Sequence, residues 1–309
     1  MSYICADRGT DKCPCSLMEI GQCYTCSMIK TGKCDCISEW QGVCPYTEYM
    51  QNGALAVKTI KTRQFDVKSV EDFSEALKVI TLDVPMGFAL ECNKPGTFLM
   101  IEAGDYKIPL SVMESKTSKD SYVKLAVYLT GPKTFALDKE VEKGSKVNVS
   151  GPFLNGLINV EKFDDRKLSL VVAKGIAMMP LLNQKNIIGN GLVRMYMDDT
   201  KLTKEFIDKY VSQLEYSRVD METDLEEIVK SILADCEYCK NNTGKNPNIF
   251  LMVSPYYKDV IINKCGFDEN DIIVPNHANM CCGEGICGAC SYTDKDGVTV
   301  RRCKCGQSL

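Results

Sequence analysis

The 309-residue chain has one histidine, one tryptophan and no long apolar segment. No uninterrupted apolar stretch approaches the roughly 18 residues that span a bilayer, so we expect no membrane contact. Residues 1–12 contain no apolar core like that of a signal peptide, which favours a cytoplasmic location. The formal net charge of −4 argues against nucleic acid as a partner, because nucleic acid attracts basic surfaces.

The scarcity of histidine also excludes certain chemistry. A Rieske-type iron–sulfur site needs two histidines, and this chain has only His277, which we interpret as structural. No acid–base or nucleophilic constellation is visible, so we expect no catalytic side chain. Any reaction should therefore be carried by cofactors.

Cysteine, by contrast, is abundant, with 18 residues in the chain. Eight lie within the first 44 residues and six lie between Cys281 and Cys305. Without an export signal these thiols should stay reduced, and thiolates grouped at short spacings in a reducing compartment usually bind metal. The sequence thus predicts a metal-binding unit at each end of the chain.

The C-terminal group has the C-x4-C-x2-C…C spacing of plant-type 2Fe–2S ligation. The predicted ligands are Cys282, Cys287, Cys290 and Cys303. Glycines at 283, 285 and 288 allow a sharp turn that aims amide N–H groups at the cluster sulfurs. A zinc site is the alternative, although zinc does not require so many glycines in one loop. Cys281 and Cys305 are spare thiols under this assignment.

The N-terminal cysteines recur almost regularly, at intervals of 10, 11 and 10 residues from 13 to 23, 34 and 44. Such spacing indicates small loops that present thiolates to shared metal. The candidate ligands are Cys13, Cys15, Cys23, Cys26, Cys34, Cys36 and Cys44, with Cys5 outside the spacing. An iron–sulfur cluster, an all-thiolate zinc site and unmetallated thiols all remain open here.

Periodicity between the two cysteine groups indicates a multi-domain fold of the α+β and α/β classes. Residues 53–163 alternate apolar and polar positions in short segments separated by Pro-Gly and Gly-Pro turns, which predicts a small antiparallel barrel. Residues 164–275 change to apolar runs near 168–172, 194–197 and 249–253. Amphipathic helices are expected at 202–214 and from 225 onward, so this region should be an α/β layer. Residues 1–52 and 276–309 are the cysteine-rich ends.

Two segments of the predicted barrel are similar to known motifs: Pro95-Gly96-Thr97-Phe98 and Gly151-Pro152-Phe153-Leu154-Asn155-Gly156. With the cysteine-rich tail, they give residues 75–309 a pattern that resembles the electron-transfer subunit of class 1B dihydroorotate dehydrogenase. Sulfide dehydrogenase-like proteins, in the same ferredoxin–NADP reductase superfamily, look closer still. The resemblance implies FAD on the barrel, NAD on the α/β domain and a 2Fe–2S cluster in the tail.

The flavin motif Arg-Pro-x-Ser of that superfamily falls on Ile108-Pro109-Leu110-Ser111. Ile108 replaces the arginine, and the adjoining Lys107 is the candidate substitute, although a lysine lacks the bidentate fork of an arginine. A second flavin segment, Gly-x-Gly-Thr, appears as Gly131-Pro132-Lys133-Thr134. Lys133 restores a positive charge near phosphate, and Thr134 keeps the hydroxyl. The resemblance therefore implies flavin binding through atypical contacts.

The dinucleotide loop departs further from the superfamily pattern. Gly-Gly-Gly-Ile-Gly-x-x-Pro aligns with residues 173–180, which place Ala173 and Ala177 where glycines allow close approach to a pyrophosphate. Lys174 and Gly175 are the remaining candidate contacts. The later Cys-Gly-Pro motif reads Val253-Ser254-Pro255. Binding of NAD(H) or NADP(H) is therefore an open question at this loop.

Two functions follow from these patterns. The first is a flavin and iron–sulfur electron-transfer subunit that passes electrons between FAD and a partner redox subunit or a ferredoxin-like protein within a hetero-oligomer, with NAD(P)H left open as a further participant. The second is a non-enzymatic iron–sulfur relay or redox sensor that keeps the fold and has lost nucleotide binding.

Overall fold

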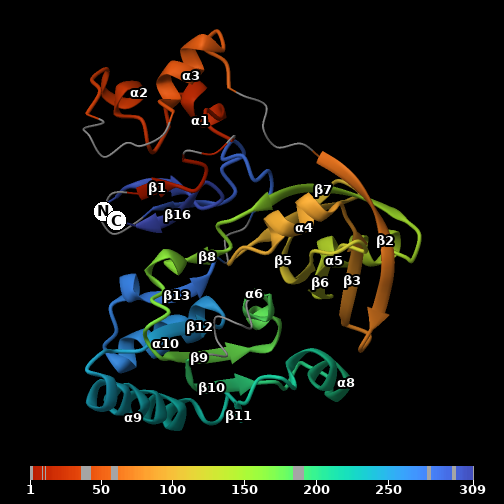
Figure 1. Cartoon of the computed structure of the whole chain (residues 1–309), viewed down its shortest axis with the longest axis vertical. Helices are drawn as coiled ribbons and strands as arrows, with labels where there is room; N and C mark the ends of the chain where they lie inside the picture. Colours follow the sequence, from red (N-terminus) through yellow and green to blue (C-terminus); the bar gives the residue numbers. More distant parts are fainter. Residues whose placement is uncertain are drawn as a thin grey trace.

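The computed structural model describes residues 3–8, 10, 12–35, 43–56, 62–183, 191–276, 280–293 and 297–308. They form a closed barrel, a six-stranded sheet with helices, and a cysteine-rich unit in which the two chain ends meet (Figure 1). No helix in these ranges is long and apolar enough to cross a membrane. Cys36, Trp40 and His277 lie outside the described residues.

Six antiparallel strands close the barrel in the order β2-β3-β6-β5-β4-β7, which confirms the predicted barrel. The strands are β2 (Thr62–Asp72), β3 (Leu77–Asp83), β4 (Phe98–Ala103), β5 (Tyr106–Lys116), β6 (Tyr122–Tyr128) and β7 (Lys146–Phe153). The strand β2 was not expected, because it buries only Phe65 and Val67 along its 11 residues and is otherwise mostly polar.

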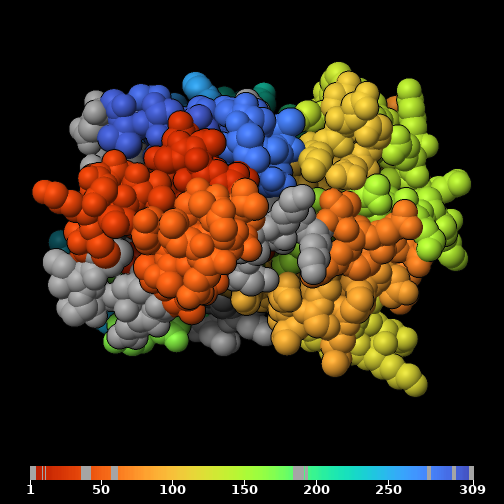
Figure 2. Space-filling model, turned by 90° about the horizontal axis from the view of Figure 1, so that it is seen from above, coloured from red at the N-terminus to blue at the C-terminus, as the bar shows by residue number. Residues whose placement is uncertain are grey.

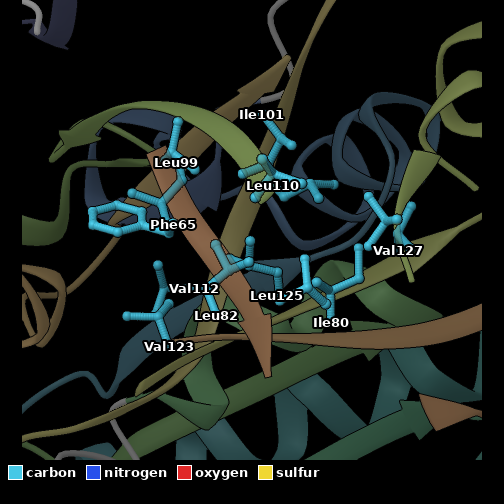
Figure 3. Packing of buried hydrophobic residues seen from close by; sticks show 14 of the residues in the cluster. Phe65, Ile80, Leu82, Leu99, Ile101, Leu110, Val112, Val123, Leu125 and Val127 are labelled. Carbon is cyan, nitrogen blue, oxygen red and sulfur yellow. The ribbon is translucent and has the colours of Figure 1, made fainter. Parts of the chain in front are cut away.

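The barrel is filled by one face of each strand, as period-two alternation requires. Figure 3 shows the inward side chains meeting at its centre, among them Phe65, Leu99, Leu110 and Leu125. Two helices add to this core: α4 (Met86–Cys92) and α5 (Pro132–Glu140), through Phe88 and Leu137 among others. The strands thus form a packed scaffold, and ligands must bind on its outside.

The second sheet has the order β11-β10-β9-β12-β13-β8 and is parallel except at β8. Its strands are β8 (Leu157–Ile158), β9 (Ser169–Lys174), β10 (Leu192–Asp198), β11 (Ser217–Arg218), β12 (Asn248–Met252) and β13 (Ile272–Pro275). The chain runs from β9 outward to β10 and β11, then returns to place β12 on the other side of β9. Doubly wound sheets bind ligands at the carboxyl ends of strands beside such a switch point.

Both faces of this sheet are covered, which explains its nearly continuous apolar strands. Val171 and Phe250 pack toward the barrel, against residues such as Leu77 and Met113. The opposite face packs against α9 (Leu225–Thr243) and α10 (Pro255–Cys265). The short α6 (Met179–Leu182) follows β9 and is entirely buried. The barrel and the sheet therefore share a core.

The two predicted helices differ in how closely the structure matches them. The helix at 225 onward is confirmed as α9, with Asp224 as its N-cap, whose carboxylate accepts from Thr223 Oγ1 at 2.8 Å. The helix expected over 202–214 is shorter and irregular, because α8 (Lys204–Phe206) continues as the π-helical segment η3 (Ile207–Val211). The apolar positions are nevertheless buried as expected, including Phe206 and Val211.

The chain ends form one unit. The strand β1 (Tyr3–Cys5) pairs antiparallel with β16 (Cys305–Ser308), and β14 (Ser291–Thr293) pairs with β15 (Thr299–Arg301). Three short helices complete it: α1 (Ser16–Glu19), α2 (Ser27–Thr31) and α3 (Pro45–Gln51). The N-terminal region (red) lies against the C-terminal region (blue) in both Figure 1 and Figure 2. The sequence did not predict this pairing, since strands of three or four residues leave no periodic signal.

Candidate functional site

The cysteine loop at 282–290 is shaped by its glycines. Gly283, Gly285 and Gly288 have φ of +72°, +78° and +75°, a region that L side chains rarely adopt. This backbone lets the Glu284 N–H donate to Cys282 Sγ at 3.3 Å. N–H groups that point at sulfur stabilise a thiolate, as metal ligation requires.

The four predicted 2Fe–2S ligands are in mutual contact. Cys290 and Cys303 have their Sγ atoms 3.1 Å apart, and the Cys303 N–H donates to Cys290 Sγ at 3.5 Å. The Cys282 thiol lies close enough to the thiols of Cys303 and Cys287 to interact with both. The thiols therefore form an unbroken chain in the order Cys287, Cys282, Cys303 and Cys290.

These contacts give the thiols different pKa values. The Cys303 hydrogen bond, helped by backbone N–H groups, lowers the pKa of Cys282 to about 3. The same thiol lowers the pKa of Cys290 to about 6, against the effect of burial. The interactions of Cys303 with Cys282 and Cys290, together with burial, hold its proton and raise the pKa of Cys303. A metal would displace that proton, since the thiolate is the ligand.

The loop is anchored to the barrel by aromatic packing. Cys290 and Cys303 are buried with Phe98, Phe153 and Met280. The rings of Phe98 and Phe153 stack with centroids 5.0 Å apart and an interplanar angle of 13°. A Cβ added at Gly283 would lie 2.8 Å from Phe153 Cζ, so no larger residue fits there without movement.

Two asparagines hold the segment just before Cys303 next to the cysteine loop. Asn155 Nδ2 donates to the Arg302 carbonyl at 2.9 Å, and Asn276 Nδ2 donates to the same carbonyl at 3.1 Å. They lie in segments that connect the barrel, the second sheet and the tail. Cys303 is thereby placed beside Cys290, and neither asparagine was singled out from the sequence. Asn155 is part of the Gly151–Gly156 motif, which was the available signal.

The four predicted ligands are a donor set of the right kind and number for a cluster with two metal atoms. A 2Fe–2S group takes two thiolates on each of its two irons. Cys290 and Cys303 form one hydrogen-bonded pair of sulfurs. In the described ranges, no three Cys, His, Asp or Glu side chains are already arranged around a single point.

The N-terminal cysteines are only partly gathered. Cys13 interacts electrostatically with Cys15, Cys23 and Cys26, and Cys26 also interacts with Cys44. Burial raises the pKa of Cys13 to about 12. Cys34 is exposed. Among the N-terminal cysteines that the structure describes, the thiols interact electrostatically, without a sulfur–sulfur hydrogen bond like that of Cys290 and Cys303.

The predicted flavin residues of β5 point in two directions. Lys107, Pro109 and Ser111 lie on the outer face of the barrel, and Lys107 pairs with Glu102 at 3.4 Å. Ile108 and Leu110 point into the barrel core. The side chain of Leu110 is therefore corrected from a flavin contact to a core residue, because the strand alternates faces. Lys107 is on the correct face to replace the missing arginine.

The second flavin segment begins helix α5. Gly131 is its N-cap, and the Thr134 hydroxyl accepts from the N–H groups of Thr130 and Gly131 at 3.0 and 3.3 Å. No acidic residue lies in the first turn, and Lys133 is exposed beside it. The helix packs against β4 and β5, so both predicted flavin segments lie on one side of the barrel. A positive helix end with a lysine suits a pyrophosphate.

The carboxyl edge of the second sheet is already occupied by its own side chains. Lys174, at the end of β9, forms an ion pair with Asp198, at the end of β10. Asp198 is fully buried and also accepts from Thr200 N, Thr200 Oγ1 and Met221 N at 3.2, 2.6 and 3.1 Å. The Lys174 ammonium lies 5.3 Å from the Tyr257 ring centroid. Lys174 is thus engaged within the protein, and its role as a dinucleotide contact stays a prediction.

The barrel followed by the doubly wound region is the fold of ferredoxin reductases. No protein-family model and no curated protein matches the sequence. The structure of an NADH-dependent reduced ferredoxin–NADP oxidoreductase matches with a TM-score of 0.58 and 17% identity, over 79% of this chain and 86% of that one. Phthalate dioxygenase reductase matches with a TM-score of 0.56 and 14% identity, over 80% of this chain and 96% of that one. A ferredoxin reductase in carbazole 1,9a-dioxygenase, in an FAD apo form, matches with a TM-score of 0.50 and 15% identity, over 70% of this chain and 66% of that one. At these identities the likeness establishes the fold alone.

Proposed function

We propose that the chain is an electron-transfer subunit in which FAD on the barrel exchanges electrons with a 2Fe–2S cluster in the C-terminal loop. The observation that carries this proposal is the chain of contacts among Cys282, Cys287, Cys290 and Cys303. A ferredoxin reductase fold next to such a loop also supports it, because phthalate dioxygenase reductase is described as transferring electrons from pyridine nucleotides to 2Fe–2S. Flavin accepts electrons in pairs, and the cluster passes them on singly.

The protein's own residues would bind and separate these groups. Lys107, Ser111, Lys133 and the N-terminus of α5 would hold the flavin phosphates outside the barrel. The buried Phe98–Phe153 stack would keep water from the inner side of the cluster. Cys287 and Ile286 are exposed, so electrons would leave toward a partner redox subunit or a ferredoxin-like protein across this edge of the loop. The N-terminal thiols would form a second metal centre, iron–sulfur or zinc.

A second function is favoured by one observation at the sheet edge. Because Lys174 and Asp198 satisfy each other, a dinucleotide would have to break a buried ion pair to bind. A chain that binds no pyridine nucleotide would be a relay or a redox sensor, supplied with electrons by another protein rather than by NAD(P)H.

The two functions are separated by purifying the full chain without oxygen and measuring iron, sulfide, zinc and released flavin. NADH or NADPH is then added and the flavin and cluster absorbance is followed. The first function predicts flavin in stoichiometric amount and a cluster that is reduced when the flavin is reduced. If no flavin is bound, even after incubation with FAD, the first function is wrong and the relay is favoured. Bleaching by NADH would show that a pyridine nucleotide supplies electrons, which the relay does not predict.

A further inference from the structure

The last ligand of the proposed cluster is followed directly by a residue that belongs to the contact between the chain ends. Cys303 precedes Lys304, whose backbone carbonyl accepts from the Ala6 N–H at 2.7 Å. The neighbouring Cys305 pairs with Cys5 in the β1–β16 ladder. The N-terminal strand therefore holds the segment that carries the fourth ligand.

Lys304 is a charged residue in an unusual position. Its side chain is only 2% exposed, and its ammonium forms an ion pair with Asp7 at 2.5 Å. Asp7 is itself 13% exposed. The lysine stem lies against the cluster loop, because a Cβ added at Gly285 would meet Lys304 Cγ at 3.1 Å. On its other side the ammonium interacts with the thiols of Cys5 and Cys15. Lys304 thus lies between the two cysteine groups.

Further contacts hold the N-terminal unit on the loop. The Arg301 N–H donates to the Tyr24 hydroxyl, and Leu17 packs against Gly285. Lys12 donates to the Pro152 carbonyl at 2.5 Å and lies over the Phe153 ring, 5.5 Å from its centroid. The unit therefore contacts the tail, the loop and the barrel aromatic that supports the loop. Figure 1 and Figure 2 show the same adjacency of the two chain ends.

We infer that the buried Lys304–Asp7 pair sets the reduction potential of the C-terminal centre, so that the N-terminal unit controls how readily the cluster accepts an electron. This inference rests on the proposed function, because it requires the 2Fe–2S cluster. Lys304 acts as a positioning residue: it touches the loop and is not itself a ligand.

The sign follows from the charges. One-electron reduction adds a negative charge to the cluster, and a nearby buried cation stabilises that charge because screening is weak in the interior. Removal of the Lys304 charge should therefore make reduction harder and lower the potential. Removal of the Asp7 charge should make reduction easier and raise it. If the Lys304–Asp7 pair only packed the unit together, replacing Lys304 and replacing Asp7 would not shift the reduction potential in opposite directions.

The experiment is a redox titration, followed by electron paramagnetic resonance, of the full chain purified without oxygen. Lys304→Met should shift the one-electron equilibrium about tenfold toward the oxidised form, which corresponds to 59 mV. Lys304→Arg keeps the charge and should stay near the wild-type potential. Asp7→Asn should shift the potential upward. Lys258→Met breaks a lysine ion pair elsewhere, with Glu269 at 2.6 Å, and serves as the control with no expected shift.

The outcomes separate this inference from the function on which it rests. If the wild-type chain has no 2Fe–2S signal, the proposed function fails, and the inference fails with it. If the signal is present and Lys304→Met leaves the potential unchanged, only the inference fails. A shift of the same size in Lys304→Arg, or a downward shift in Asp7→Asn, would also overturn it, because packing rather than charge would then set the potential. Should Lys304→Met lose the cluster, the Asp7→Asn and Lys304→Arg titrations decide.

Discussion

The cysteine loop and the carboxyl edge of the second sheet differ in how far their residues match the site that the sequence predicts there. The loop has the spacing of plant-type 2Fe–2S ligation and brings predicted ligands together, with the sulfurs of Cys290 and Cys303 3.1 Å apart on a buried aromatic support. The sheet edge has a topological switch point, but there Lys174 and Asp198 pair with each other. A fold does not by itself establish a binding site on it.

The difference lies in what each site requires of its backbone. A cluster loop needs particular residues, four thiols and glycines at positive φ, and it fails if any is lost. A switch point between β9 and β12 arises from the chain topology alone, so it does not depend on which residues follow β9. Tests of the comparison should therefore remove ligands from the loop and remove the internal ion pair from the edge.

The largest effect is expected at the loop. Cys287→Ser should abolish the 2Fe–2S absorbance and its electron paramagnetic resonance signal, because a serine oxygen replaces one of four thiolates. Cys281→Ser is the matched control, since Cys281 is exposed, adjacent to the loop and outside the ligand set. Iron and sulfide analysis should show loss only in the first variant. An unchanged spectrum in Cys287→Ser would mean that the ligand assignment is wrong.

The next largest effect is expected at the sheet edge. Lys174→Met leaves Asp198 buried without its cation, which typically costs about 3–5 kcal/mol of unfolding free energy. The double variant Lys174→Met/Asp198→Asn should recover much of that loss, because no buried charge remains. Denaturant unfolding, followed by tryptophan and tyrosine fluorescence, measures both. A small loss in the single variant would show that water reaches Asp198 and that the edge is open.

Acid should weaken this ion pair in a defined pH window. Burial alone would raise the pKa of Asp198, but the Lys174 hydrogen bond and those from Thr200 and Met221 lower it below its ordinary value. A carboxyl whose pKa is lowered on folding contributes stability above its unfolded pKa of about 3.9. That contribution is lost as pH falls through the folded pKa. The stability difference between wild type and Asp198→Asn should therefore shrink below about pH 4 and be constant above pH 5.

A smaller effect is expected where the loop meets the barrel. Gly283→Ala combines a φ of +72° with a Cβ 2.8 Å from Phe153, and it should cost about 3 kcal/mol. Gly297→Ala has a φ of +79° and nothing within 4 Å, so it should cost only about 1 kcal/mol. Thermal unfolding of the cluster-loaded chain measures the difference. Equal costs would mean that the loop does not press on Phe153.

The sequence predicted the barrel, the α/β region and the four thiols that contact one another, because these features depend on local periodicity and spacing. It did not predict the aromatic support, the asparagine anchors or the Lys304–Asp7 pair. Those depend on residues far apart in the chain, such as Asp7 and Lys304, 297 positions apart. Leu110 was misplaced because a motif alignment gives no information about which face of a strand a residue occupies. The ion pair of Lys174 was not predicted either, because its partner, Asp198, belongs to another strand.

The smallest effect is expected at the flavin site, where the contacts are indirect. Lys133→Gln removes the charge beside the N-terminus of α5 and should weaken FAD binding about tenfold, or about 1.4 kcal/mol. Lys139→Gln, on the last turn of the same helix, is the matched control and should bind FAD like wild type. Fluorescence quenching of FAD by chain stripped of flavin measures both affinities. If both variants bind equally, Lys107 on β5 becomes the main phosphate contact, and Lys107→Gln should then show the larger loss. That result would place the flavin closer to β5 than to α5.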